Sequence, residues 1–241
     1  MPNIDPLTYI KTVLAKEFAS PSHPPRPSGQ PRPSLLITLS RDYGADGEAV
    51  AHGLAQSLSL PVYDKEILDK VAASAKTDKF RFEAHDEQSS AGLSAFLYSL
   101  VSGNPATLRD YRRHLCEAVL ETARQDCLII GRGAHLILAG QQRIFRVRVV
   151  GSKAVCARRV ALESNLSAAE AERKVAEVNH QRHQAVLDLF HDSIERCSLE
   201  HADLFDLVVN TDHIPAAGAV AVVLLAMRHA GHLAEAPPCL A

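Results

Sequence analysis

A short loop with two glycines stands between an apolar run and an amphipathic segment near the start of the chain. The run Leu35–Ser40 is typical of a buried parallel strand, and Glu48–Leu58 is typical of a helix. A loop that leads into a helix N-terminus offers free backbone N–H groups and the positive end of the helix dipole, which together bind phosphate. Gly44 and Gly47 would let a phosphate approach the backbone closely. The expected donor-phosphate residues are Ser40, Arg41, Tyr43, Gly44, Asp46 and Gly47.

This loop departs from the strict phosphate-loop pattern G-x-x-x-x-G-K-[ST]. Glu48 and Ala49 stand where the lysine and the hydroxyl residue would follow, and Arg41 is the cation that could replace the lysine. Asp46 and Glu48 would weaken phosphate binding through like-charge repulsion. An ordinary strand–helix turn with two glycines therefore stays open as the alternative interpretation.

Asp64 and Arg132 each follow a short apolar run that is typical of a strand. Open α/β sheets bind ligands outside the carboxyl ends of their strands, so both residues are expected beside a ligand. Arg132 stands between Gly131 and Gly133, where a guanidinium can donate two parallel hydrogen bonds to a phosphate. We predict that Asp64 and Arg132 bind the acceptor. The alternatives are that Asp64 caps the helix beginning at Lys65 and that Arg132 is a surface arginine in a turn.

A further arginine lies on the inward face of a long predicted helix. Ser167 and Glu170 form a capping box that starts this helix, which runs to about Phe190. Arg182 falls on its apolar stripe, where a charge is costly unless it meets an anion or a carboxylate. A transferring phosphate and a buried ion pair are both compatible with this position.

Arg158 and Arg159 are adjacent and cannot share one helix face. The offset of Arg158 from Val155 and Leu162 predicts that Arg158 is the solvated one. Phosphoryl transfer depends mainly on positioning and charge neutralisation. We therefore expect the catalytic residues to be Arg41, Arg159 and Arg182.

No residue pattern in the chain indicates a protein-held transition metal. The acidic stretch 83–87 and the pair His180 and His183 lack the H-E-x-x-H spacing or a cysteine partner, so they are interpreted as solvated groups. Mg²⁺ is expected to bind mainly through the phosphates of a nucleotide.

Short apolar runs alternate with amphipathic segments along the rest of the chain. Strands are predicted at 35–40, 61–63, 127–130, 144–150 and 206–210. Helices are predicted at 48–58, 65–75, 108–124, 167–190 and 215–229. This alternation implies an α/β fold of three layers, in which helices cover both faces of a parallel sheet.

The ends of the chain differ in composition from this main domain. Residues 1–34 are predicted to hold a helix at 5–19 and a Pro/Ser-rich linker, because the prolines after residue 20 exclude helix or central strand. The main domain is expected at 35–232, with a tail at 233–241. The apolar residues of 76–107 show no regular helix or strand spacing, so this stretch is interpreted as an insertion.

Composition narrows the class of partner. The chain has 241 residues, 46% of them apolar, and a formal net charge of −2, so neither a nucleic-acid polymer nor a membrane is an expected partner. The five cysteines form no C-x-x-C pair and are interpreted as reduced thiols of a cytoplasmic protein. A homodimer is the commonest assembly for such a protein.

Four segments together resemble the cytidylate kinase-like family of P-loop proteins. They are I-T-L-S-R-D-Y-G-A-D-G, L-P-V-Y-D-K-E-I-L, I-I-G-R-G-A-H-L-I-L and D-L-V-V-N-T-D, and the likeness runs from about residue 35 to residue 225. The resemblance implies a nucleoside-kinase-like core sheet, an acceptor-binding flap, which would be the insertion at 76–107, and a lid at about 152–190. It also implies that Arg132 binds the acceptor phosphate, although Ile130 stands where the family usually has an acidic residue.

The resemblance implies a phosphotransferase that uses ATP with Mg²⁺. Its acceptor would be a nucleoside monophosphate such as CMP, or another small molecule. The missing loop lysine leaves a second hypothesis, a catalytically degenerate module that binds a nucleotide and regulates a partner through its N-terminal helix. A purely structural α/β protein is the third.

Overall fold

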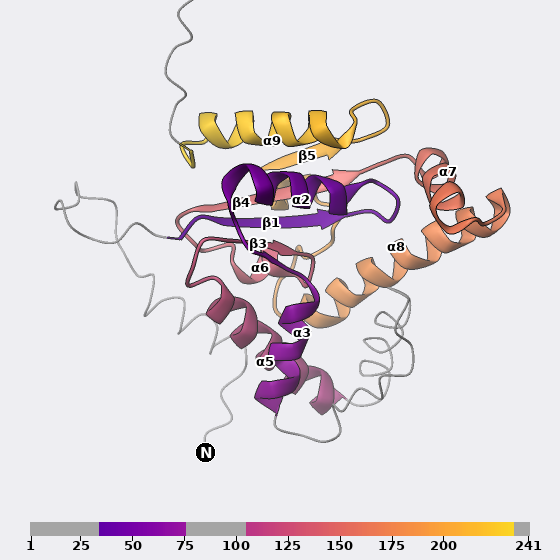
Figure 1. Ribbon diagram of the computed structural model, residues 1–241. Helices are drawn as coiled ribbons and strands as arrows, with labels where there is room; N and C mark the ends of the chain where they lie inside the picture. The colour runs from indigo at the N-terminus through magenta and orange to yellow at the C-terminus, as the bar shows by residue number, and fades with distance from the viewer. Residues whose placement is uncertain (1–33, 76–104, 234–241) are drawn as a thin grey trace, which may run out of the picture.

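The computed structural model describes residues 34–75 and 105–233, which form one parallel sheet with helices on both faces (Figure 1). The sheet has five strands in the order β2-β3-β1-β4-β5, and every neighbouring pair is parallel. The strands are β1 (Leu36–Arg41), β2 (Val62–Tyr63), β3 (Cys127–Ile130), β4 (Ile144–Val150) and β5 (Leu207–Asn210).

Two sets of helices form the outer layers. Helices α2 (Gly47–Leu58) and α9 (Ala216–His229) lie together on one face of the sheet. The other face carries α3 (Lys65–Ala75), α5 (Pro105–Thr122) and the short α6 (Ala134–Ile137). Helix α7 (Lys153–Ser164) packs on α8 (Ala168–Phe190), and a 3-10 turn covers Ala202–Leu204.

The alternation of side chains along β1 divides the core in two. Ile37 and Leu39 are fully buried in a cluster with apolar side chains of α2 and α9. Leu36 points to the opposite face, in a cluster with side chains of α3, α5 and α6. Both faces of the strand are therefore covered, which explains why its sequence is a continuous apolar run. The predicted three-layer α/β/α fold is confirmed.

Strand β1 lies at the centre of the sheet, and later strands of the chain lie on both sides of it. Its residues pair with β3 on one side, as Leu39 does with Ile130, and with β4 on the other, as Arg41 does with Val149. The carboxyl ends of β1, β3 and β4 thus meet at the point where the strand order reverses. Open α/β sheets bind their ligands at this position.

Most predicted elements are found within a few residues of their expected bounds. Helix α5 begins at Pro105, three residues before its predicted start, and neither the short α6 nor α7 is among the predicted helix ranges. The predicted helix at 5–19, the linker, most of the insertion at 76–107 and the tail after 233 lie outside the described residues. Among the helices of 34–75 and 105–233, none is both long and apolar enough to cross a membrane.

Candidate phosphate-binding site

The loop between β1 and α2 is held tightly by its neighbours. Gly44 has a φ of +81°, and a Cβ added there would lie 2.7 Å from the backbone oxygen of Cys156 on α7. A Cβ on Gly47 would lie 2.4 Å from the Cβ of Arg41. Both positions therefore need glycine for packing, whether or not a ligand is bound. The first N–H groups of α2 have no partner within the helix, as at any helix N-terminus, and such groups can bind an anion.

Side chains from distant segments fix the loop in place. The backbone N–H of Tyr43 donates to Oδ1 of Asn179 on α8 at 2.7 Å. Thr211, just after β5, donates through Oγ1 to the carbonyl oxygen of Ala45 at 3.0 Å. The Tyr43 ring lies below the guanidinium of Arg182, with 5.7 Å from the guanidinium carbon to the ring centroid. Helix α8 and the end of β5 thus set the shape of the loop.

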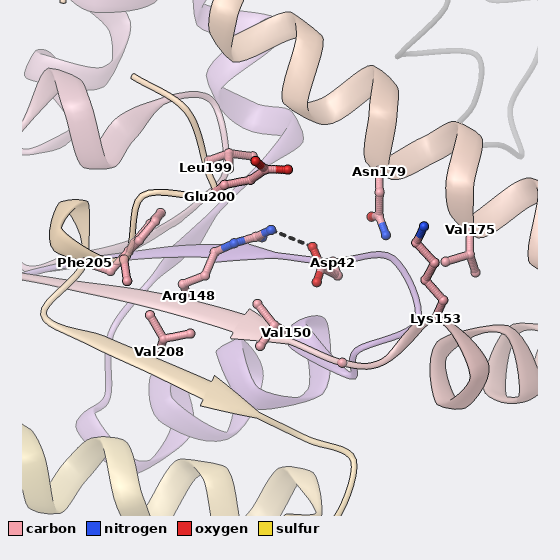
Figure 2. A pocket seen from close by; sticks show the side chains of 12 residues that line it. Asp42, Arg148, Val150, Lys153, Val175, Asn179, Leu199, Glu200, Phe205 and Val208 are labelled. Carbon is pink, nitrogen blue, oxygen red and sulfur yellow. Dashed lines mark hydrogen bonds and ion pairs between the residues drawn. The ribbon is translucent and has the colours of Figure 1, made fainter. Parts of the chain in front are cut away.

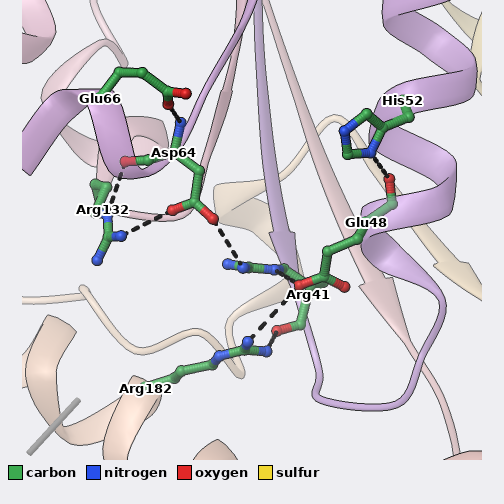
Figure 3. A network of polar contacts seen from close by, with 7 residues as sticks. All are labelled: Arg41, Glu48, His52, Asp64, Glu66, Arg132 and Arg182. Atoms are coloured by element: carbon green, nitrogen blue, oxygen red, sulfur yellow. Dashed lines mark hydrogen bonds and ion pairs between the residues drawn. The ribbon is translucent and has the colours of Figure 1, made fainter. Parts of the chain in front are cut away.

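Five charged side chains at this edge of the sheet form one network, here called the arginine cluster (Figure 3). Arg41 donates through Nε to Glu48 at 2.8 Å, and its Nη2 lies 3.5 Å from Asp64. Arg132 donates through Nη2 to the other carboxylate oxygen of Asp64 at 2.8 Å. Arg182 lies 3.9 Å from Glu48 and donates to the carbonyl oxygen of Arg41 at 3.2 Å. Arg41 therefore connects Glu48, on α2, with Asp64, just after β2.

The arginine cluster carries more positive than negative charge. Its three guanidinium groups are well covered, with 12%, 12% and 19% of the Arg41, Arg132 and Arg182 side chains exposed, and they face two carboxylates. Burial and the nearby charge of Arg41 lower the pKa of Arg182 to about 10, so it stays protonated at neutral pH. A covered excess of positive charge favours an anionic ligand.

The turn after β3 presents Arg132 through an unusual backbone. Gly131, Arg132 and Gly133 have φ values of +69°, +59° and +64°, all in the left-handed region. A Cβ on Gly133 would lie 2.4 Å from the ring of Phe190, and one on Gly131 would lie 3.0 Å from Nη1 of Arg41. A left-handed arginine is strained by about 1–3 kcal/mol, and such strain clusters at functional sites.

Arg159 and Arg158 on α7 have different surroundings. Arg159 donates to the carbonyl oxygens of Gly44 and Thr211 at 3.3 and 2.7 Å, and its Nε lies 3.3 Å from the Asp46 carboxylate. These contacts tie α7 to the loop. Arg158 is exposed, as predicted, but the reason given was wrong. Leu162 is 80% exposed, and the packed face of α7 is formed by Cys156, Ala157 and Val160.

The structure brings most of the predicted residues together around the carboxyl ends of β1 and β3. Arg41, Asp64, Arg132 and Arg182 share the arginine cluster, and Tyr43, Gly44, Asp46 and Gly47 form the adjoining loop. Both carboxylate oxygens of Asp64 face arginines. Ser40 is 5% exposed at the end of β1.

Sequence reasoning missed a second polar group beside the loop (Figure 2). Arg148 on β4 donates through Nη2 to Asp42 at 2.5 Å, next to a cavity of about 370 Å³ that Lys153 and Asn179 also line. An adjoining cavity of about 290 Å³ reaches Arg41 and Arg182. The alternation of Arg146 and Arg148 with valines in β4 was the available signal, because charges are unusual in a buried parallel strand.

Cation ligands are sparse in the described part of the chain. No group of three or more His, Cys, Asp and Glu side chains there could hold a metal ion. The carboxylates in and beside the loop each pair with an arginine; they are those of Asp42, Asp46, Glu48 and Asp64.

Comparison with known proteins supports the fold and the family. The model of the cytidylate kinase-like family matches residues 36–213. An uncharacterized protein from Eubacterium ventriosum has a similar structure, with a TM-score of 0.60, 17% sequence identity, and coverage of 81% of this chain and 99% of that chain. A shikimate kinase from Acinetobacter baumannii aligns with a TM-score of 0.45 and 12% identity over 84% of this chain and 96% of its own. No curated protein matches the chain.

Proposed function

Because this chain belongs to the cytidylate kinase-like family, we propose that it transfers the γ-phosphoryl group of ATP to a nucleoside monophosphate such as CMP. Family membership supports a nucleotide-binding phosphotransferase. The observation that carries the proposal is the arginine cluster, in which guanidinium groups from β1, the turn after β3 and α8 converge at the switch point of the sheet. Phosphoryl transfer needs this kind of convergent positive charge.

Each part of the site has a proposed role. The N-terminus of α2 and Arg41 bind the donor phosphates, and Arg132 binds the acceptor phosphate beside Asp64. Arg182 lies next to Arg41 and stabilises the charge that develops on the transferred group. Arg159 holds α7 against the loop, so its proposed contribution to the reaction is to keep the loop in position.

The residues present fit an Mg²⁺ ion that is bound through the nucleotide. Ala49 supplies no hydroxyl ligand after the loop, so the phosphates themselves would hold the ion. When bound, the ion would help to neutralise the charge of the phosphates.

A second candidate function is nucleotide binding without transfer. The pair that Glu48 forms with Arg41 favours it, because it engages an arginine that donor phosphates would otherwise use. The carboxylate of Asp46, in the same loop, would repel those phosphates. In this case the chain would regulate a partner protein in response to nucleotide.

One experiment separates the two functions. The purified full chain is incubated with ATP, Mg²⁺ and each nucleoside monophosphate in turn, and ADP formation is measured beside the affinity for ATP by calorimetry. ADP formation that depends on one monophosphate supports the transferase. Micromolar ATP binding with no ADP above background rejects the transferase and supports the binding module.

A further inference from the structure

Glu48 occupies the position in the arginine cluster that a donor phosphate would take. It is the second residue of α2, so its carboxylate lies at the helix end where an anion binds. One oxygen accepts a hydrogen bond from Nε of Arg41 at 2.8 Å and lies 3.9 Å from Nη2 of Arg182. The carboxylate thus meets both arginines that are proposed to contact the donor phosphates.

The carboxylate is charged at neutral pH and can leave without repacking. Burial raises its pKa, but the charge and hydrogen bond of Arg41 and the charge of Arg182 outweigh this effect and hold the pKa below its ordinary value. Its side chain is 52% exposed, whereas those of Arg41 and Arg182 are 12% and 19% exposed. Glu48 can therefore swing into solvent while the arginines stay in place.

Asp46 differs from Glu48 in this respect. Its partner Arg159 is also bonded to two backbone carbonyl oxygens, of Gly44 and Thr211. Removing the Asp46 carboxylate would leave Arg159 fixed by those bonds. Loss of the Glu48 contacts, by contrast, would free N–H groups of Arg41 and Arg182 to bind a ligand.

We propose that Glu48 is an internal competitor for the donor-phosphate site, which a phosphate ligand must displace to reach Arg41 and Arg182. This inference rests on the proposed function only for the location of the donor site. It identifies Glu48 as the residue that sets the affinity of the site for phosphate groups. A ligand must bring enough negative charge and enough acceptor oxygens to replace the carboxylate.

The proposal is tested by calorimetric titration of the full chain with sodium pyrophosphate in the absence of Mg²⁺. Glu48→Gln keeps the shape of the side chain and removes its charge, and we expect it to lower the Kd for pyrophosphate about fivefold, the effect of one partly exposed ion pair. Glu48→Ala is measured in parallel and should lower the Kd as well.

Glu66→Gln is the charge-matched control. Glu66 lies on α3 beside Asp64, where its carboxylate accepts a hydrogen bond from the Asp64 backbone N–H at 3.0 Å, a bond that glutamine can also accept (Figure 3). This variant should change the Kd by less than about twofold. Its charge is exposed, is not the one paired with Arg41 and Arg182, and is screened by salt.

Three outcomes would overturn the proposal. They are an unchanged or higher Kd in both Glu48 variants, an equal gain in Glu66→Gln, which would show a general effect of net charge, and no pyrophosphate binding by either wild type or the Glu48 variants. Failure of the transferase assay with the Glu48 effect intact would reject the proposed reaction and leave this inference standing.

Discussion

The loop after β1 and the turn after β3 look alike in sequence but are built differently. Each follows a central strand, contains two glycines and presents an arginine at the same edge of the sheet. In the loop, the glycines accommodate α7 and the Arg41 side chain, and Glu48 pairs with the arginine. In the turn, three successive left-handed residues hold Arg132 toward Asp64. Similar spacing therefore reports the backbone shape only in outline. Both arginines end in an ion pair, Arg41 with a carboxylate of its own loop and helix and Arg132 with the carboxylate that follows another strand.

The largest expected effect concerns the packing of the loop. Gly44→Ala should lower the free energy of unfolding by about 3 kcal/mol, because the added Cβ overlaps a backbone oxygen of α7 and the left-handed φ is strained. Denaturant unfolding followed by circular dichroism measures the change. Gly140→Ala is the matched control, since a Cβ there meets nothing within 4 Å. Equal stability of the two variants would contradict the packing role of Gly44.

The turn should matter more for activity than for stability. Arg132→Ala removes the acceptor-side guanidinium and should lower kcat/KM for phosphoryl transfer about 100-fold, within the range for losing one charge-stabilising donor. Steady-state assays with ATP, Mg²⁺ and the best monophosphate measure it. Arg132→Lys should recover a small part, because lysine cannot donate the bidentate pair. If the activity of Arg132→Ala stays within twofold of wild type, the acceptor does not bind at this turn.

His135, which follows the turn in α6, should make this side of the molecule acid-sensitive. It is 1% exposed and stacks on Phe205, and burial together with Arg148 and Arg146 lowers its pKa to about 3. The unfolded chain takes up the proton near pH 6.5 and the folded chain does not. Stability from this group is thus complete above pH 6.5 and falls by about 1.4 kcal/mol per pH unit below it.

Replacing His135 by leucine should remove this slope. Urea unfolding of wild type and His135→Leu at several pH values between 7 and 5 gives the difference directly. His52→Gln, on the exposed side of α2, is the control and should keep the wild-type slope. Parallel pH curves for wild type and His135→Leu would show that His135 does not cause the acid sensitivity.

The smallest expected effect separates the two adjacent arginines of α7. Arg159→Ala should cost about 1 kcal/mol of unfolding free energy, because bonds to two backbone carbonyl oxygens are lost. Arg158→Ala should stay within about 0.5 kcal/mol, as is usual for an exposed residue. Thermal melts of the two variants measure the difference. A larger loss in Arg158→Ala would mean that the loop is not held through Arg159.

Sequence reasoning found the elements because their periods are local. The apolar run of β1 and the capping box before α8 depend on neighbours a few residues apart, and both are present as predicted. It also found the arginines at the strand ends. It gave the wrong reason for the exposure of Arg158, because the offset from Leu162 does not reveal which face of α7 is packed.

Residue types and local spacing by themselves determined the α/β alternation, the turns that need glycine and the arginines available to an anion. These follow from backbone sterics and from the periods of helix and strand. The tertiary structure alone decided the strand order, which places β3 beside β1, and the pairs that Arg41 forms with Glu48 and Asp64. Such pairs join groups from separate elements at distances of a few ångströms. Their strength depends on burial and geometry, and neither can be read from spacing along the chain.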